Sequence, residues 1–338
     1  MGVFYAHRYK LFFFLLVLLP LTSAATLPQS NSPVLAQASA NATTPALTTT
    51  ANNASNVNID ATFYTFPIFS GPALDTHAVL MSGVQFMARH AVEDIHGEVR
   101  RMSWHSPDPR YASVGISVLP AYDGDTVNRR LMMWGFDKGL HYLMEHNRFA
   151  SVRFRMLKNG VDGGSIEFAL LPEGQRGTVG PGERVARLEQ REGGVEPASA
   201  KVDGSLTLNV ANSRTYCRLC GYDLEAFEVF RPIVTILRRA AEYQPRHHIG
   251  SFQSPTEIGA TALRFVDQER RSPPFFETQF LIKAAVAVPQ YMLDKGSFSE
   301  TEIRVNVDGT LVATGLLKIA RSPPPRPQRR KKSTCIIS

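Results

Sequence analysis

The chain has 338 residues, with 37 Lys and Arg against 30 Asp and Glu, which gives a formal net charge of +7 and a pI near 9.4. Without Arg8, Lys10 and the six basic residues of 321–338, the rest of the chain has 29 basic residues against 30 acidic ones. A nucleic-acid-binding protein needs its basic surface on the folded part, so this distribution argues against nucleic-acid binding. The three cysteines are too few for a disulfide scaffold, and the fold must depend on an apolar core.

The N-terminal segment, residues 1–25, is typical of a signal peptide. Arg8 and Lys10 precede an apolar run at 11–19, Pro20 interrupts that run, and small residues follow. A membrane-spanning helix needs about 20 predominantly apolar residues, and this run is shorter. We therefore expect a secreted, extracellular protein with no membrane span in the mature chain. Anchoring to the membrane through the same segment is the alternative.

Residues 26–58 are rich in Ser, Thr, Ala, Asn and Pro and have few large apolar side chains. Such a segment buries too little surface to offset the entropy lost on ordering, so a disordered stalk is expected. Both N-glycosylation sequons noted in the sequence, at Asn41 and Asn53, fall within it. Glycosylation at these two sites would agree with secretion.

An internal duplication becomes visible when the chain is aligned with itself so that His141 falls on Gln290. The segment 141–155 then matches 290–304, and in the same register Leu80, Val84 and Met87 fall on Val229, Ile233 and Ile236. We interpret this as two repeats, at 59–172 and 203–320, built on one plan. The Gly-rich, charged segment 173–202 between them is expected to be a flexible linker.

Apolar periodicity in the first repeat predicts the order helix, hairpin, helix, hairpin. The residues that carry this pattern are Leu80, Val84, Met87, Ala91 and Ile95 for one helix, Val114, Ile116 and Val118 for a strand paired with 98–104, Met132, Phe136, Leu140 and Leu143 for the second helix, and Val152, Phe154 and Met156 for the last hairpin. Asp125 or Thr126 is expected to cap the second helix. The fold class is therefore α+β, with helices packed on antiparallel sheet and the two repeats related by a pseudo-twofold axis.

Cys217 and Cys220 form a lone C-x-x-C sequence. A zinc site would require a second cysteine pair or two suitably spaced histidines, which do not follow. A short disulfide that pins a strand-to-helix turn is the favoured interpretation in a secreted protein. A thioredoxin-like redox pair stays open, because a helix start is predicted shortly after.

The common catalytic motifs for phosphate, dinucleotide and serine-hydrolase chemistry are missing, and we assign no catalytic, metal or cofactor-binding residue. His90 and His96 are spaced for different helix faces and suit a solvated helix end better than a metal site.

Carboxylate pairs have no local motif, so Asp123, Asp125, Glu145 and Asp294 stay open as candidates for a hydrolase site between the halves. The aromatic residues Trp104, Trp134, Tyr142 and Tyr291 favour core packing over such a cleft.

The C-terminal segment, residues 321–338, is Pro-rich and basic, and we expect a disordered tail. It ends in Cys335-Ile336-Ile337-Ser338, a prenylation box, after a P-x-x-P-x-R sequence suited to an SH3 domain. A chain in the secretory lumen never meets a cytosolic prenyltransferase, so the two end signals exclude each other. The signal peptide is favoured, and prenylation of Cys335 with membrane tethering is the alternative.

The Ser/Thr-rich leader, followed by units of helix and apolar hairpin around 131–170 and 280–319, resembles filamentous-fungal secreted proteins of unknown function. This resemblance implies no activity. The leading hypothesis is a non-enzymatic module that binds a cell-surface glycan or a protein. The alternatives are a secreted hydrolase with a carboxylate site between the halves and a prenylated membrane-tethered protein.

Overall fold

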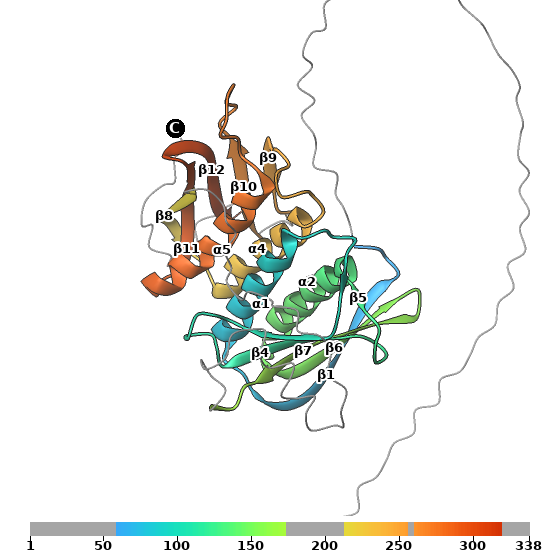
Figure 1. Cartoon of the computed structure of the whole chain (residues 1–338). Helices are drawn as coiled ribbons and strands as arrows, with labels where there is room; N and C mark the ends of the chain where they lie inside the picture. The colour runs from blue at the N-terminus through green and yellow to red at the C-terminus, as the bar shows by residue number, and fades with distance from the viewer. Residues whose placement is uncertain (1–58, 174–212, 256–259, 320–338) are drawn as a thin grey trace, which may run out of the picture. The chain divides into compact units, whose positions relative to one another are not determined.

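Two five-stranded antiparallel sheets, each covered on one face by two helices, form the described part of the chain (Figure 1). The computed structural model describes residues 59–173, 213–255 and 260–319. The α+β class with helices on antiparallel sheet is therefore confirmed. The predictions for Asn41, Asn53, Cys335, the signal peptide, the stalk, the linker and the tail lie outside the described residues.

The first half, residues 59–173, contains two helices and seven strands in the order β1 (Phe63–Ala73), α1 (Thr76–Ala91), β2 (Glu98–Val99), β3 (Met102–His105), β4 (Val114–Leu119), β5 (Val127–Asn128), α2 (Arg129–His146), β6 (Ala150–Lys158) and β7 (Val161–Leu170). Its sheet has the strand order β1-β6-β7-β4-β3. β2 pairs separately with β5.

The second half, residues 213–319, contains β8 (Ser213–Asp223), α4 (Ala226–Ala240), β9 (Ser251–Gln253), β10 (Thr261–Asp267), α5 (Thr278–Lys295), β11 (Ser299–Val307) and β12 (Thr310–Ile319). Its sheet has the order β8-β11-β12-β10-β9. In the register that places His141 on Gln290, α2, β6 and β7 coincide with α5, β11 and β12 at both ends of each element. The match found in the sequence thus continues through whole elements.

A strand precedes the first helix in each half, so the predicted order of helix, hairpin, helix, hairpin is incomplete. β1 and β8 are missing from this prediction, as is the short β5, and β1 and β8 each lie at an edge of their sheet. Alternation is hidden in β1, because large apolar residues point to both faces, and Pro67 weakens the strand signal. In β8, the inward positions Ser213, Thr215 and Cys217 are not large apolar residues, so the strand lacks a clear apolar face.

The second helix is capped by Asn128, and not by Asp125 or Thr126 as expected. The Asn128 side chain accepts a hydrogen bond from the backbone N–H of Arg130 at 3.1 Å. The chain cannot turn into a helix earlier because Val127 and Asn128 are paired with β2. The cap is therefore Asn128, the last residue of this pairing, whose side chain is well suited to an N-cap.

The two long hairpins turn in the same way. Asn159 and Gly160 join β6 to β7 with φ values of 53° and 77°, and Asp308 and Gly309 join β11 to β12 with values of 49° and 78°. Positive φ at both central residues is the signature of a type I′ turn, which suits Asn-Gly and Asp-Gly.

By sequence alone, Val161-Asp162-Gly163 resembles Val307-Asp308-Gly309 after a gap. The structure corrects this, since Asn159-Gly160 is the turn equivalent to Asp308-Gly309 without any gap.

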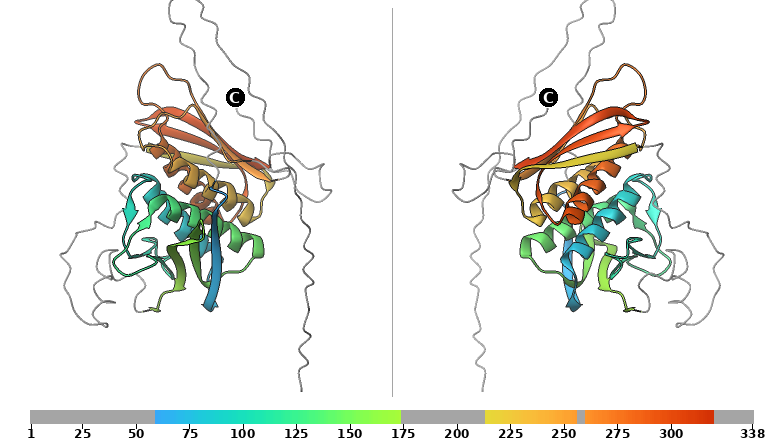
Figure 2. Two further views of the ribbon diagram at one scale, coloured as in Figure 1. Left: turned by 90° about the vertical axis from the view of Figure 1, so that its right-hand side faces the viewer. Right: turned by 90° about the vertical axis from the view of Figure 1, so that its left-hand side faces the viewer.

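The helices of the two halves pack against each other, with α1 and α2 against α4 and α1 against α5, so the helices lie between the two sheets (Figure 2). Ion pairs cross this layer: Arg130 to Glu242 at 2.9 Å and Arg238 to Asp137 at 3.7 Å. The apolar stripes of the helices are buried on the sheet side and between the halves. This packing makes each half dependent on the other for covering its helices.

Matching contacts join the ends of the helices across the two halves. The ring of Phe149, after α2, stacks on Phe227 at 5.6 Å, and the ring of Phe298, after α5, lies 5.9 Å from His77. Both phenylalanines also hold their own half, since their carbonyl groups accept hydrogen bonds from Leu74 and Leu224 at 3.0 Å. The same pair of contacts therefore occurs in both directions.

The tryptophans belong to the core of the first half. Trp104 is 4% exposed and lies against Phe86, and Trp134 is 5% exposed and lies against Phe63. Both therefore pack between helices and sheet, and neither is placed to line an open cleft between the halves. Among the described residues, no helix combines the length and the apolarity needed to span a membrane.

Candidate functional site

The outer face of the second sheet, the face that points away from the helices, carries the candidate site. Side chains alternate along β8: Cys217 and Leu219 pack against the core, whereas Arg214, Tyr216 and Arg218 point outward and are exposed. Tyr216 is 51% exposed. The outer face of β8 is therefore a row of arginine, tyrosine and arginine.

The neighbouring strand adds a second row of polar side chains. On β11, Asn306 lies opposite Arg214, Arg304 opposite Tyr216, and Glu302 opposite Arg218. Residues directly opposite in an antiparallel pair project to the same face. These six residues, which we call the β8–β11 grid, therefore form one continuous surface two strands wide.

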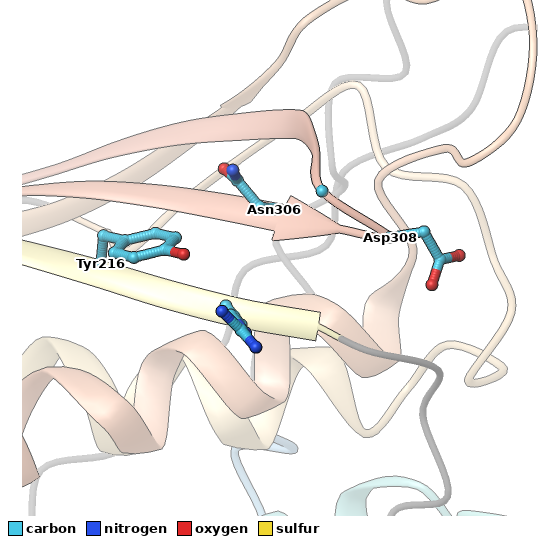
Figure 3. A pocket seen from close by; sticks show the side chains of 5 residues that line it. Tyr216, Asn306 and Asp308 are labelled. Atoms are coloured by element: carbon cyan, nitrogen blue, oxygen red, sulfur yellow. The ribbon is translucent and has the colours of Figure 1, made fainter.

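Two open grooves cross this grid and share Tyr216. The larger, about 450 Å³, is lined by Arg214, Tyr216, Asn306, Asp308 and Gly309. The smaller, about 260 Å³, is lined by Tyr216, Cys217, Arg218, Glu302 and Arg304. Figure 3 shows Tyr216 and Asn306 on the side of the sheet away from the helices, with Asp308 in the turn after β11.

The charges of the grid are only partly paired. Arg218 donates to the carboxylate of Glu302 at 2.5 Å. Within the described part of the chain, the guanidinium groups of Arg214 and Arg304 form neither an ion pair nor a side-chain hydrogen bond. Two cations next to an exposed aromatic ring are thus available to an external group.

Further cations continue the surface across the sheet. Arg264 on β10 lies opposite Leu316, in the same row as Glu302 and Arg218. Lys318 on β12 lies one row further along, and both side chains are exposed. The outer face therefore carries five cations, Arg214, Arg218, Arg264, Arg304 and Lys318. Three carboxylates, Glu300, Glu302 and Asp308, accompany them.

Glu300 has a structural role within this face. It is 9% exposed, and its carboxylate accepts hydrogen bonds from the backbone N–H groups of Tyr222 and Ile319, both at 3.3 Å. It thereby ties the end of β8 to the end of β12. Its negative charge is therefore stabilised by backbone N–H groups of the protein, in contrast to the exposed cations around it.

Cys217 is a free thiol in the structure, so the expected disulfide between Cys217 and Cys220 does not form. Both residues lie inside β8, where positions i and i+3 are about 10 Å apart and point to opposite faces. A disulfide needs Cα atoms within roughly 7 Å. Burial raises the pKa of the Cys217 thiol to about 12, so it stays protonated at neutral pH. This chemistry does not suit the thioredoxin-like alternative, whose nucleophilic thiol has a lowered pKa.

The carboxylates considered for a hydrolase are held separately. Asp294 is hydrogen-bonded to Arg110 at 2.5 Å, which lowers the pKa of that carboxyl group, and exposed Asp123 is paired with Arg101 at 3.1 Å. Asp125 and Glu145 are exposed. No hydrogen bond joins any two of these four within the described residues, and none of them lines the two grooves.

The histidines are engaged in local contacts. Buried His90 lies 3.1 Å from the carboxylate of Glu93, and His96 lies 3.4 Å from Arg130. Over the residues that the structure describes, no group of three or more His, Cys, Asp or Glu side chains is placed to hold a metal ion.

Sequence reasoning missed the grid because it summed charge by segment. A near-neutral total hides the separation of cations onto one face of one sheet. The available signal was the alternation Arg214-x-Tyr216-x-Arg218 together with Glu302-x-Arg304-x-Asn306, where polar residues recur every second position. This alternation indicates one shared face only if β8 is recognised as a strand.

No family model matches the chain, and no curated protein matches it. Among solved structures, the tandem DUF26 ectodomain of a cysteine-rich receptor-like protein from Arabidopsis thaliana is 6% identical. That alignment covers 76% of this chain and 96% of the other, with a TM-score of 0.21. A candidate thioesterase from Novosphingobium aromaticivorans is 13% identical, with 77% and 96% covered and a TM-score of 0.12. At these TM-scores neither likeness bears on the fold or the function of this chain.

Proposed function

We propose that the chain is a non-enzymatic extracellular module that binds a cell-surface glycan on the outer face of its second sheet. The observation that supports this most is the position of Tyr216, an exposed ring shared by two open grooves and flanked by Arg214 and Arg304. Large exposed rings and unpaired cations on one rigid surface are features of binding sites.

The chemistry of the grooves suits a sugar. One face of a sugar ring presents C–H groups that pack on the π face of an aromatic ring, and Tyr216 offers such a face. The hydroxyl groups of the sugar need hydrogen-bond partners, which the Asn306 amide and the Asp308 carboxylate can supply. The grooves are open, so a polymer can extend beyond them.

The proposed extracellular location rests on the signal peptide and on the sequons at Asn41 and Asn53. A prenylated form attached at Cys335 is the competing topology. The intact masses of the secreted and cell-bound fractions separate the two, because they report signal cleavage, glycans and any prenyl group together. A cell-bound chain carrying a prenyl mass would overturn the extracellular assignment.

We also propose that the two halves are copies of one unit related by a pseudo-twofold axis. The constant spacing in sequence between α2, β6, β7 and α5, β11, β12 supports this, as do the reciprocal contacts of Phe149 and Phe298. In this arrangement the helical layer fixes the second sheet from behind, so the grooves exist before a ligand arrives. A preformed site loses less entropy on binding.

A panel of soluble polysaccharides in affinity gel electrophoresis tests the function. We expect retardation by at least one polymer, about tenfold weaker binding for Tyr216→Ala because a stacking ring is worth roughly 1–1.5 kcal/mol, and no shortening of the polymer. Phe66→Ala is the matched control, since Phe66 is the exposed ring at the equivalent place in β1. Equal binding by wild type and Tyr216→Ala would overturn the proposed site.

A further inference from the structure

We infer that the ligand is an acidic polysaccharide, with carboxylate or sulfate groups, that lies across β8, β11, β12 and β10. This inference rests on the proposed function and adds the charge class and the direction of the ligand. The observation behind it is the set of exposed cations Arg214, Arg264, Arg304 and Lys318, which form no ion pair with any residue the structure describes.

The spacing of these cations favours a polymer over a small anion. Arg214 and Arg218 are four positions apart on β8, which corresponds to about 13 Å at roughly 3.3 Å per residue. Arg264 lies in the row of Arg218 but three strands away, which corresponds to about 14 Å at roughly 4.8 Å per strand. Arg304 lies on β11 opposite Tyr216, in the row between those of Arg214 and Arg218. A single anion cannot reach all these groups, whereas a chain with repeated anionic groups can.

The guanidinium groups are suited to this ligand in two ways. An arginine binds a carboxylate or sulfate through two parallel hydrogen bonds, and such charge-assisted bonds are stronger than those between neutral groups. Arg214 and Arg304 need to break no ion pair before they bind. Between them, Tyr216 can pack against the sugar ring that carries or adjoins the anionic group.

The first sheet is an internal control for this argument. Its outer face has arginines on β6, but Arg153 is paired with Glu167 at 3.0 Å and Arg155 with Asp162 at 2.7 Å. Arg155 holds the same position in β6 that Arg304 holds in β11. Both sheets thus carry an arginine at this position, but only in the second sheet is that arginine without an ion-pair partner among the described residues.

A nucleic acid fits the same face less well. Double-stranded DNA carries a phosphate on each strand about every 3.4 Å along the helix axis, and such closely spaced charges would come near Glu302 and Asp308 as well as the arginines. Glu302 lies next to Arg218, and Asp308 lines the groove with Arg214. A polysaccharide places neutral hydroxyl groups between its anionic groups, and these can donate hydrogen bonds to the same carboxylates.

The test compares two double variants. The first combines Arg214→Gln and Arg304→Gln on the second sheet, and the second combines Arg153→Gln and Arg155→Gln, the matched control on the first sheet. The full secreted chain is titrated with polygalacturonate, heparin, neutral dextran and double-stranded DNA at about 50 and 200 mM salt. We expect an acidic polysaccharide to bind best, with affinity falling as salt rises. The second-sheet pair should lose about tenfold or more, and the magnitude of the slope of log K against log salt should fall by about two. The first-sheet pair should stay near wild type. Thermal unfolding of both double variants checks that each is folded.

The outcomes separate the two levels of the proposal. If dextran bound as tightly as the acidic polymers, the acidic ligand would be wrong but the proposed function would stand. The same would follow if binding required Tyr216 but did not depend on salt or on the arginines. Tighter binding of DNA than of either acidic polysaccharide would also overturn the acidic ligand. Equal losses in the two double variants would place the ligand elsewhere, and failure to bind any of the polysaccharides would overturn both proposals.

Discussion

The outer faces of the two sheets have the same layout and different side chains. The edge strands β1 and β8 have equal length, and when Phe63 is placed on Ser213, Tyr64, Phe66 and Ile68 occupy the places of Arg214, Tyr216 and Arg218. The first trio is apolar and half-exposed, with Phe66 at 54% and Ile68 at 51%. One fold thus presents an apolar edge in one half and a cationic, aromatic edge in the other.

This difference shows which part of the fold is constrained. The inner faces of both sheets must cover helices, and Phe154 and Phe168 in the first half and Ile303 and Leu317 in the second are all at most 1% exposed. The outer faces have no such partner, so their side chains can differ without loss of core packing. Function is therefore expected where the halves diverge, on the outer face of the second sheet.

The largest effect is expected when β8 receives the outward residues of β1. The variant combines Arg214→Tyr, Tyr216→Phe and Arg218→Ile. Two cations and the Tyr216 hydroxyl group are lost, and at about 1.5–3 kcal/mol for a charged hydrogen bond the affinity for an acidic polysaccharide should fall roughly 100-fold. Titration with polygalacturonate measures this, and thermal unfolding checks the fold. Affinity within a few-fold of wild type would show that the outward residues of β8 do not form the site.

The next effect concerns the backbone, where the two edge strands also differ. Gly221 has φ of 61° and sits against Glu300, whereas Gly71, at the equivalent place in β1, does not have a positive φ. Gly221→Ala should lower the free energy of unfolding by about 2 kcal/mol, because Ala is strained at positive φ and its Cβ would displace the Glu300 carboxylate. Gly71→Ala, whose Cβ would meet only the Ser151 side chain, should be less destabilised. Denaturant unfolding compares the two, and equal losses would mean that the ends of the edge strands are not constrained differently.

A smaller effect is expected from removing the acid that neutralises Arg218. Glu302→Gln should raise the affinity for an acidic polysaccharide about twofold to fivefold, because the pair is partly exposed and such pairs are worth less than about 1 kcal/mol. Glu167→Gln, which frees Arg153 on the first sheet, is the matched control and should change little. The same titration at low salt measures both, and a gain with Glu167→Gln alone would reverse the assignment of the two faces.

The smallest effect concerns the contact between the loop of Arg110, in the first half, and α5. Hydrogen bonds from Arg110 lower the pKa of Asp108 and of Asp294 below their ordinary values. A carboxyl group with a lowered folded-state pKa stabilises the fold above its unfolded pKa of about 4, and that stability is lost as the pH falls through the folded pKa. Both groups are near the surface, so Arg110→Gln should only slightly flatten the loss of stability in acid. Thermal unfolding from pH 6 to about pH 3 measures it, and an unchanged pH profile would remove Arg110 from this role.

The parts of the fold fixed by burial could be predicted from the sequence. Leu80, Val84 and Met87 on α1 and Val229, Ile233 and Ile236 on α4 are all fully buried, as their periodicity indicated. The edge strands could not, because a strand with one solvent face and one neighbour tolerates proline, cysteine and arginine. The Cys217–Cys220 disulfide was expected because a turn was assumed where the chain is extended.

The candidate site was harder to predict than the fold for a physical reason. Its residues belong to strands far apart in sequence, since Tyr216 and Arg304 become neighbours only when β8 pairs with β11. The total charge of a segment does not report this pairing. Only the register of the sheet shows which cations share a face.

Hydrogen exchange with and without polygalacturonate is the most direct measurement of where the ligand binds. The proposal predicts slower exchange in peptides from β8 and from the turn between β11 and β12 when the polymer is added. Peptides from β1 and from the turn between β6 and β7 should exchange as before, since they occupy the equivalent places in the first half. Protection in the first-sheet peptides, or equal protection in both sheets, would contradict a ligand site on the outer face of the second sheet.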